Sequence, residues 1–136
     1  MRNKDLAVDY ITRAGHRLEA AKLLFDRKSY ADVVRESQEL VELALKALLR
    51  ISNIEIPRVH DVGPILVEQQ HLLPKAAQNH VAALSKISKN LRRDRELAFY
   101  GSEDLTPSDF YREEDAHQAL QDASWVYSIC KTTLST

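Results

Sequence analysis

Three polar residues recur at four-residue intervals in the first half of the chain: Gln38, Glu42 and Lys46. This spacing places their side chains along one edge of an α-helix, where each can contact the next. Glu42 and Lys46 can form an ion pair worth a few tenths of a kcal/mol, so a purely structural role is one interpretation. The other interpretation is a functional surface on an otherwise apolar helix.

A basic segment in the second half contains a further group of residues that could do chemistry. Five cations fall within ten residues: Lys86, Lys89, Arg92, Arg93 and Arg95. A run of this kind is usually a solvated helix surface. It leads, however, to Tyr100, and a guanidinium can hold a phosphate while an aromatic ring stacks a base. The segment therefore predicts a nucleotide or RNA contact with salt-sensitive binding.

The composition limits the class of protein. Lys and Arg number 19 and Asp and Glu number 20, which gives a formal net charge of -1 over 136 residues. This balance disfavours a globally basic protein that binds polyanions without specificity, so any nucleic-acid contact must come from a local patch. A chain of this length is expected to form a single helical domain over residues 1–136.

Cysteine use and hydropathy indicate the compartment. The one cysteine, Cys130, cannot close an intrachain disulfide or build a thiolate metal site, which favours a reducing, cytoplasmic location. No run of about 18 apolar residues is present to span a membrane. The sequence also has no glycine-rich phosphate loop and no histidine pair at helical spacing, so we expect neither a cofactor nor a metal ion.

The apolar pattern predicts the elements that position these residues. With 3 Gly and 4 Pro, the chain has few sites for tight turns, which favours long helices. Apolar residues at intervals of three and four predict helices over 7–25, 30–48, 75–101 and 116–134, and a short helix near 61–66. We therefore expect an all-α, up-and-down bundle of four or five helices. The second helix, apolar on more than half of its circumference, should be its centre.

Local signals predict where these helices begin and end. Ser29 and Asp61 are expected N-caps, and Thr106 is expected to begin a short turn before the last helix. Pro57 is expected to end the second helix, because it biases the preceding residue away from helical angles. Gly15 lies inside the first helix, which suggests that a neighbouring backbone approaches closely there.

The run from Ser37 to Leu49 resembles the signature helix of the HEPN family, in which Gln, three residues, Glu and three further residues precede Lys-Ala-Leu. The opening helix, the Ser29-Tyr30 turn and the Val59-His60-Asp61 segment before the third helix are also similar in order and spacing. The resemblance covers essentially the whole chain.

The resemblance implies an up-and-down bundle similar to nucleotidyltransferase substrate-binding subunits. It also implies a homodimer, and a partnership with a minimal nucleotidyltransferase in a toxin–antitoxin pair or a link to RNA processing. It favours the functional interpretation of Gln38, Glu42 and Lys46. We then expect this edge and the cationic end of the fourth helix, with Arg95, to converge on one pocket. The expected function is a binding and interaction module.

Active HEPN ribonucleases carry Arg, four to six residues and His, where His acts in acid–base chemistry near neutral pH. In this sequence Arg95 is followed by Tyr100 where the family has His. Tyrosine, with a pKa near 10, is a poor proton acceptor at neutral pH. The alternative to a binding module is a metal-independent endoribonuclease that uses Arg95 and Tyr100 in a degenerate motif. A helical scaffold without a ligand is a third possibility.

Two other motifs have simpler interpretations. Arg112 and His117 are separated by four residues, but three of these are carboxylates that would repel RNA phosphates. We interpret this string as the solvated start of the last helix, with acids placed favourably against the helix dipole. His60-Asp61 is similar to the dyad of metal-dependent phosphohydrolases, but no second motif supplies further ligands.

Overall fold

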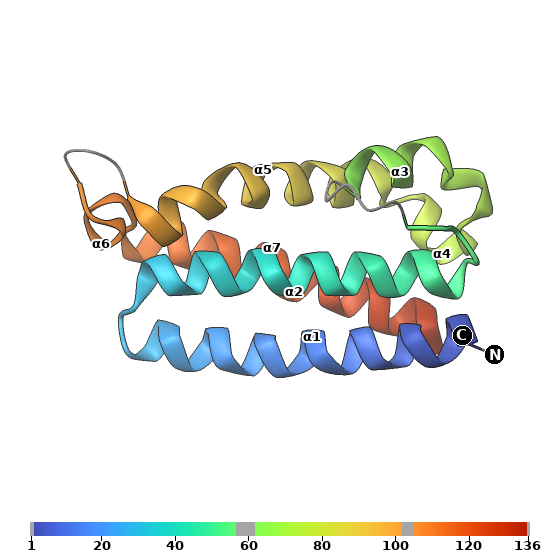
Figure 1. Ribbon diagram of the computed structural model, residues 1–136, viewed down its shortest axis with the longest axis horizontal. Coiled ribbons are helices and arrows are strands. Elements are labelled where there is room, and N and C mark those ends of the chain that lie inside the picture. The colour runs from blue at the N-terminus through green and yellow to red at the C-terminus, as the bar shows by residue number, and fades with distance from the viewer. Residues whose placement is uncertain (1, 57–61, 102–104, 136) are drawn as a thin grey trace.

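The computed structural model describes residues 2–56, 62–101 and 105–135; for residues 94–100 the description covers the backbone alone. Four long helices dominate it: α1 (Arg2–Asp26), α2 (Tyr30–Ile51), α5 (Val81–Tyr100) and α7 (Glu113–Ser135). They run side by side along the long axis of the molecule (Figure 1). No strand occurs within the described ranges. The all-α, up-and-down bundle that the apolar pattern predicts is thus confirmed.

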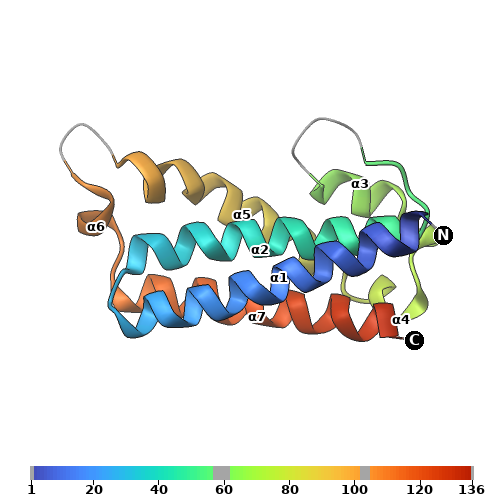
Figure 2. The same ribbon diagram turned by 60° about the horizontal axis from the view of Figure 1, so that its bottom comes forward.

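Short helical segments close the two ends of the bundle. They are α3 (Gly63–Glu68), the 3-10 turn η1 (Gln70–Leu72), α4 (Lys75–Gln78) and α6 (Pro107–Phe110). Both chain termini lie at the end that carries α3 and α4, while α6 lies at the other end (Figures 1 and 2). No helix in the described part of the chain has the length and hydropathy that a membrane span requires.

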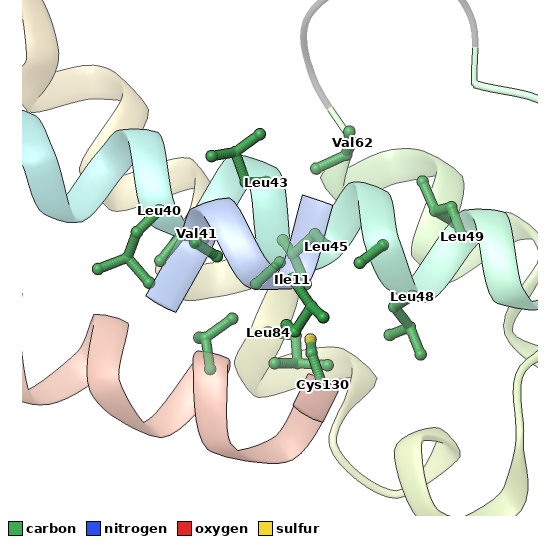
Figure 3. Packing of buried hydrophobic residues seen from close by; sticks show 14 of the residues in the cluster. Ile11, Leu40, Val41, Leu43, Leu45, Leu48, Leu49, Val62, Leu84 and Cys130 are labelled. Atoms are coloured by element: carbon green, nitrogen blue, oxygen red, sulfur yellow. The ribbon is translucent and has the colours of Figure 1, made fainter. Parts of the chain in front are cut away.

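Helix α2 is the centre of the bundle, as its wide apolar face predicts. It packs against α1, α5 and α7, and Leu40, Leu45 and Leu48 on it are fully buried. Each such leucine contributes about 1.5–3 kcal/mol through removal from water. Ile11 and Leu84 reach the same cluster from α1 and α5 (Figure 3).

Cys130 is a core residue of α7. Its side chain is fully buried, and burial raises the pKa of the Cys130 thiol to about 12. A thiol with so high a pKa stays protonated at neutral pH and acts as a small apolar group.

Gly15 packs against a side chain of α7 rather than a backbone. A Cβ atom at Gly15 would lie 2.9 Å from the hydroxyl oxygen of Tyr127 and 3.4 Å from two carbons of its ring. The expectation of a close neighbour is confirmed, but the expectation that this neighbour is backbone is wrong. The missing side chain makes room for the Tyr127 ring between α1 and α7.

The segment 75–101 is not one helix, in contrast to the prediction from its apolar pattern. It forms α4 and α5, separated by a turn at Asn79 and His80. In this turn the N–H of His80 donates to the carbonyl of Ala77, three residues back. The imidazole ring packs edge-on against Trp125 of α7, with ring centroids 5.4 Å apart. This contact with a distant residue accompanies a break that local periodicity does not mark.

The end of α2 is set by Asn53 and not by Pro57. Asn53 has a left-handed conformation, with φ 58°, which Asn tolerates better than most residues. Its N–H donates to the carbonyl of Arg50, and the N–H of Ile54 donates to the carbonyl of Leu49. This pair of hydrogen bonds is a Schellman motif. The helix has therefore ended before Pro57, which lies outside the described residues.

The predicted N-caps fare differently. Ser29 precedes α2 as expected, but its hydroxyl donates to a carboxylate oxygen of Asp32 at 2.6 Å instead of capping a backbone amide. Thr106 begins α6 as expected, and its N–H donates to Asp109 at 2.9 Å. The residue that precedes α3 is Val62; the expected cap Asp61 lies outside the described residues, as does the whole Val59-His60-Asp61 segment.

Candidate functional site

The side chains of Gln38, Glu42 and Lys46, here called the polar edge, form a continuous chain of contacts along α2. The Nε2 of Gln38 donates to Oε2 of Glu42 at 3.1 Å. The Nζ of Lys46 lies 3.1 Å from Oε1 of the same carboxylate. Because each carboxylate oxygen has its own partner, the position of the Glu42 side chain is fixed from both sides.

The polar edge is more buried than an ordinary surface ion pair. The side chains of Glu42 and Lys46 are 15% and 28% exposed, and Gln38 is 5% exposed. Within the part of the chain that the structure describes, the Oε1 of Gln38 is buried without a hydrogen-bond partner. An unmet acceptor of this kind costs about 1–3 kcal/mol. The edge is therefore not arranged for stability alone.

The charge state of Glu42 connects α2 with α5. Burial by itself would raise the pKa of the Glu42 carboxyl, but Lys46, the Gln38 amide and the guanidinium of Arg92 together hold this pKa below its ordinary value. Arg92 lies on α5. The carboxylate is therefore ionised at neutral pH, and a cation from a second helix lies within electrostatic range of it. The structure thus brings Arg92 close to the polar edge.

Arg95 and Tyr100 lie in the last two turns of α5. Arg95 follows Arg92 by about one helical turn. Their side chains lie outside the described residues, so their predicted contact with a nucleotide or RNA stays a prediction.

Sequence spacing did not single out Ser37, which lies beside the polar edge. Its side chain is fully buried, and its hydroxyl has no hydrogen-bond partner among the described residues. A buried serine next to a buried glutamine is an unusual pair of polar residues for the central helix of a bundle. Their neighbouring positions within an apolar run could have indicated this.

The Arg112–His117 string lies at the start of the last helix, as expected. The N–H of Arg112 donates to a carboxylate oxygen of Asp115 at 2.9 Å, a hydrogen bond that caps the first turn of α7. The ring of His117 packs near Phe25 of α1, with centroids 6.2 Å apart. In the described ranges no three His, Cys, Asp or Glu residues gather in a way that could hold a metal ion.

With this geometry in place, comparison with known proteins identifies the family. The model of the HEPN domain matches residues 7–133. The chain belongs to the HEPN domain family. The match includes the polar edge and all of α5, so every candidate site residue lies inside the HEPN domain.

Two relatives extend this assignment. A protein of Methanocaldococcus jannaschii named "Putative toxin MJ1304" is 30% identical to this HEPN chain over 131 residues, which cover 92% of this chain and 86% of the relative. The crystal structure of ST0689, described as an archaeal HEPN homologue, superposes with a TM-score of 0.63 at 24% identity. It covers 94% of this chain and 97% of that chain. This likeness confirms the HEPN fold.

Proposed function

We propose that this HEPN chain is a binding and interaction module of a toxin–antitoxin system, acts as a homodimer, and engages a minimal nucleotidyltransferase partner or its nucleotide. The contact surface is the polar edge of α2 with the adjoining face of α5. The name of the M. jannaschii relative supports the link to toxins. The family resemblance supports the choice of a nucleotidyltransferase as partner.

The observation that carries this proposal is the position of Glu42 between two helices. Lys46 reaches it from the same helix, and Arg92 acts on it from α5. The groups are half-buried, so their charges are less screened by water than those of a surface pair. Preorganised donors and one acceptor of this kind suit the phosphate and base edges of a nucleotide, or a polar surface of a partner protein.

Co-expression tests the partnership. A tagged copy of this chain is produced together with a minimal nucleotidyltransferase encoded next to its gene, and the complex is recovered by size exclusion. We expect co-elution for the wild type and a clear loss for Arg92→Gln. Lys89→Gln is the matched control, because Lys89 is an exposed cation on the same helix. Separate elution of the two wild-type proteins would overturn the proposed partnership.

The proposed homodimer has its own test. The mass of the purified chain in solution, measured by light scattering at micromolar concentration, should be twice the 15.5 kDa of one chain. A monomer under these conditions contradicts this part of the proposal.

A metal-independent endoribonuclease is the second candidate, favoured by the toxin name of the relative. It predicts RNA cleavage that survives chelation of metal ions and disappears in Arg95→Ala. An inert preparation across several RNAs removes this candidate and leaves the binding module.

A further inference from the structure

A second hollow of different chemistry lies between α1 and α7. It has a volume of about 420 Å³ and is lined by Lys22 from α1 and by His117, Gln121, Ser124, Trp125 and Ser128, with Leu120, from α7. Its volume falls within the range of small-molecule sites. None of its residues comes from α2 or α5, so it is separate from the polar edge. We call it the α1/α7 groove; the two helices lie side by side in Figure 2.

The floor and wall of the α1/α7 groove follow from the register of α7. Ser124 and Ser128 lie on successive turns of the helix and carry short side chains, which leaves space above them. Trp125 forms the wall, and its ring is held from the other side by the edge-on contact with His80. An indole ring fixed in this way offers a flat apolar surface for an aromatic ligand.

The polar end of the groove carries cations. Lys22 and His117 are both exposed there. Lys22 makes no ion pair within the part of the chain that the structure describes. His117 and Trp125 are eight residues apart, which corresponds to about 12 Å along the helix axis. A nucleoside monophosphate in an extended conformation spans a comparable length.

The sign of the lining charges separates this groove from the other hollows of the molecule. No carboxylate lines it. Three further hollows lined by described residues each carry at least one: Glu55 and Glu68 in one, Glu36 in another, and Glu114, Asp115 and Asp122 in the third. An anionic ligand therefore meets less repulsion in the α1/α7 groove than in these three.

We infer that the α1/α7 groove binds a nucleoside monophosphate, with the phosphate beside Lys22 and His117 and the base stacked on Trp125. Stacking on an aromatic side chain contributes about 1–3 kcal/mol per base and tolerates any base. The phosphate adds charge-assisted hydrogen bonds to the ammonium group. This site is independent of the proposed partner surface.

Trp125 provides a direct readout, because it is the single tryptophan of the chain. Tryptophan fluorescence is followed while AMP is added, with excitation at the red edge where AMP does not absorb. We expect saturable quenching by AMP. Adenosine and inorganic phosphate, added separately, should each bind much more weakly, since each lacks one half of the interaction. Absence of saturable quenching at millimolar AMP would overturn the inference, and so would equal quenching by phosphate alone.

Variants locate the binding. Lys22→Gln should weaken AMP binding about tenfold, the equivalent of one charged hydrogen bond. Lys4→Gln, which removes an exposed cation from the same helix, should have no effect. Ser124→Leu should abolish quenching because the larger side chain fills the groove, while circular dichroism confirms that the helices form. Unchanged affinity in Lys22→Gln or in Ser124→Leu contradicts the inference. Arg92→Gln should leave the fluorescence response intact, whatever its effect on the proposed partner; its loss there would assign the signal to the polar edge instead.

Discussion

The two sides of α2 differ in what they bury. One side presents Leu40, Leu45 and Leu48, all without exposed surface, to the cluster formed with α1, α5 and α7. The polar edge presents an amide, a carboxylate and an ammonium group, of which the last two keep part of their surface in water. The same helix therefore carries a surface whose contacts are apolar and a surface whose contacts are electrostatic.

This difference teaches which residues to change for which effect. Apolar burial contributes about 25 cal/mol per Å² and does not depend on pH or salt. Ion pairs of partly exposed groups contribute roughly 0–1 kcal/mol and depend on both. Substitutions on the apolar side should thus lower stability, while substitutions on the polar edge should change binding more than stability.

Leu45→Ala should have the largest effect on the apolar side. Leu45 is fully buried in the central helix, so the substitution leaves a cavity and should lower the free energy of unfolding by about 2–5 kcal/mol. Urea denaturation followed by circular dichroism measures this loss. A change below about 1 kcal/mol would mean that the core around Leu45 is loosely packed and would break the comparison.

Gly15→Ala should have a smaller effect, of about 1 kcal/mol destabilising. The added methyl meets the Tyr127 hydroxyl oxygen at 2.9 Å, and this overpacking exceeds the gain in helix propensity. Removal of that oxygen in Tyr127→Phe should relieve the contact, so Gly15→Ala should cost less in that background. A double-mutant cycle measures the coupling, and a coupling of zero would show that the two residues do not touch.

Glu42→Gln should have the smallest effect on stability, about 0.5 kcal/mol at neutral pH. The pKa of the folded Glu42 carboxyl lies below its ordinary value of 4.5, so the ionised form is the one that stabilises the fold. This contribution is fully present above about pH 4.5 and is lost as the pH falls through the lower pKa of the folded state.

The measurement that checks this is the difference in unfolding free energy between wild type and Glu42→Gln as a function of pH. We expect the difference to shrink on acidification below pH 4.5. A difference that stays constant to the acid limit, or grows there, would show that the carboxylate is not held by Lys46 and Arg92.

Local patterns in the sequence predict much of this fold. The four long helices and the central place of α2 follow from apolar spacing, because burial of one helix face is what that spacing records. The break between α4 and α5 does not follow from it, since His80 packs there against Trp125 from another helix. The end of α2 at Asn53 depends on a left-handed residue, a weaker signal than the proline further on.

The candidate site divides in the same way. The contacts of Gln38, Glu42 and Lys46 are local to one helix, and their four-residue spacing predicts them. The proximity of Arg92 to Glu42 depends on how α5 packs on α2, so the sequence could suggest these residues as a group but not their pairing. Lys22 and Trp125 lie far apart in the chain, and no local pattern connects them; the antiparallel packing of α1 on α7 does.

The dissociation constant of the complex between this chain and the neighbouring nucleotidyltransferase, for wild type and for Lys46→Gln, tests the binding role of the polar edge most directly. We predict that Lys46→Gln raises this constant about tenfold, a loss of roughly 1.4 kcal/mol, while its free energy of unfolding changes by no more than about 0.5 kcal/mol. Equal dissociation constants for the two proteins would contradict the account, because the polar edge would then serve the helix and not the partner.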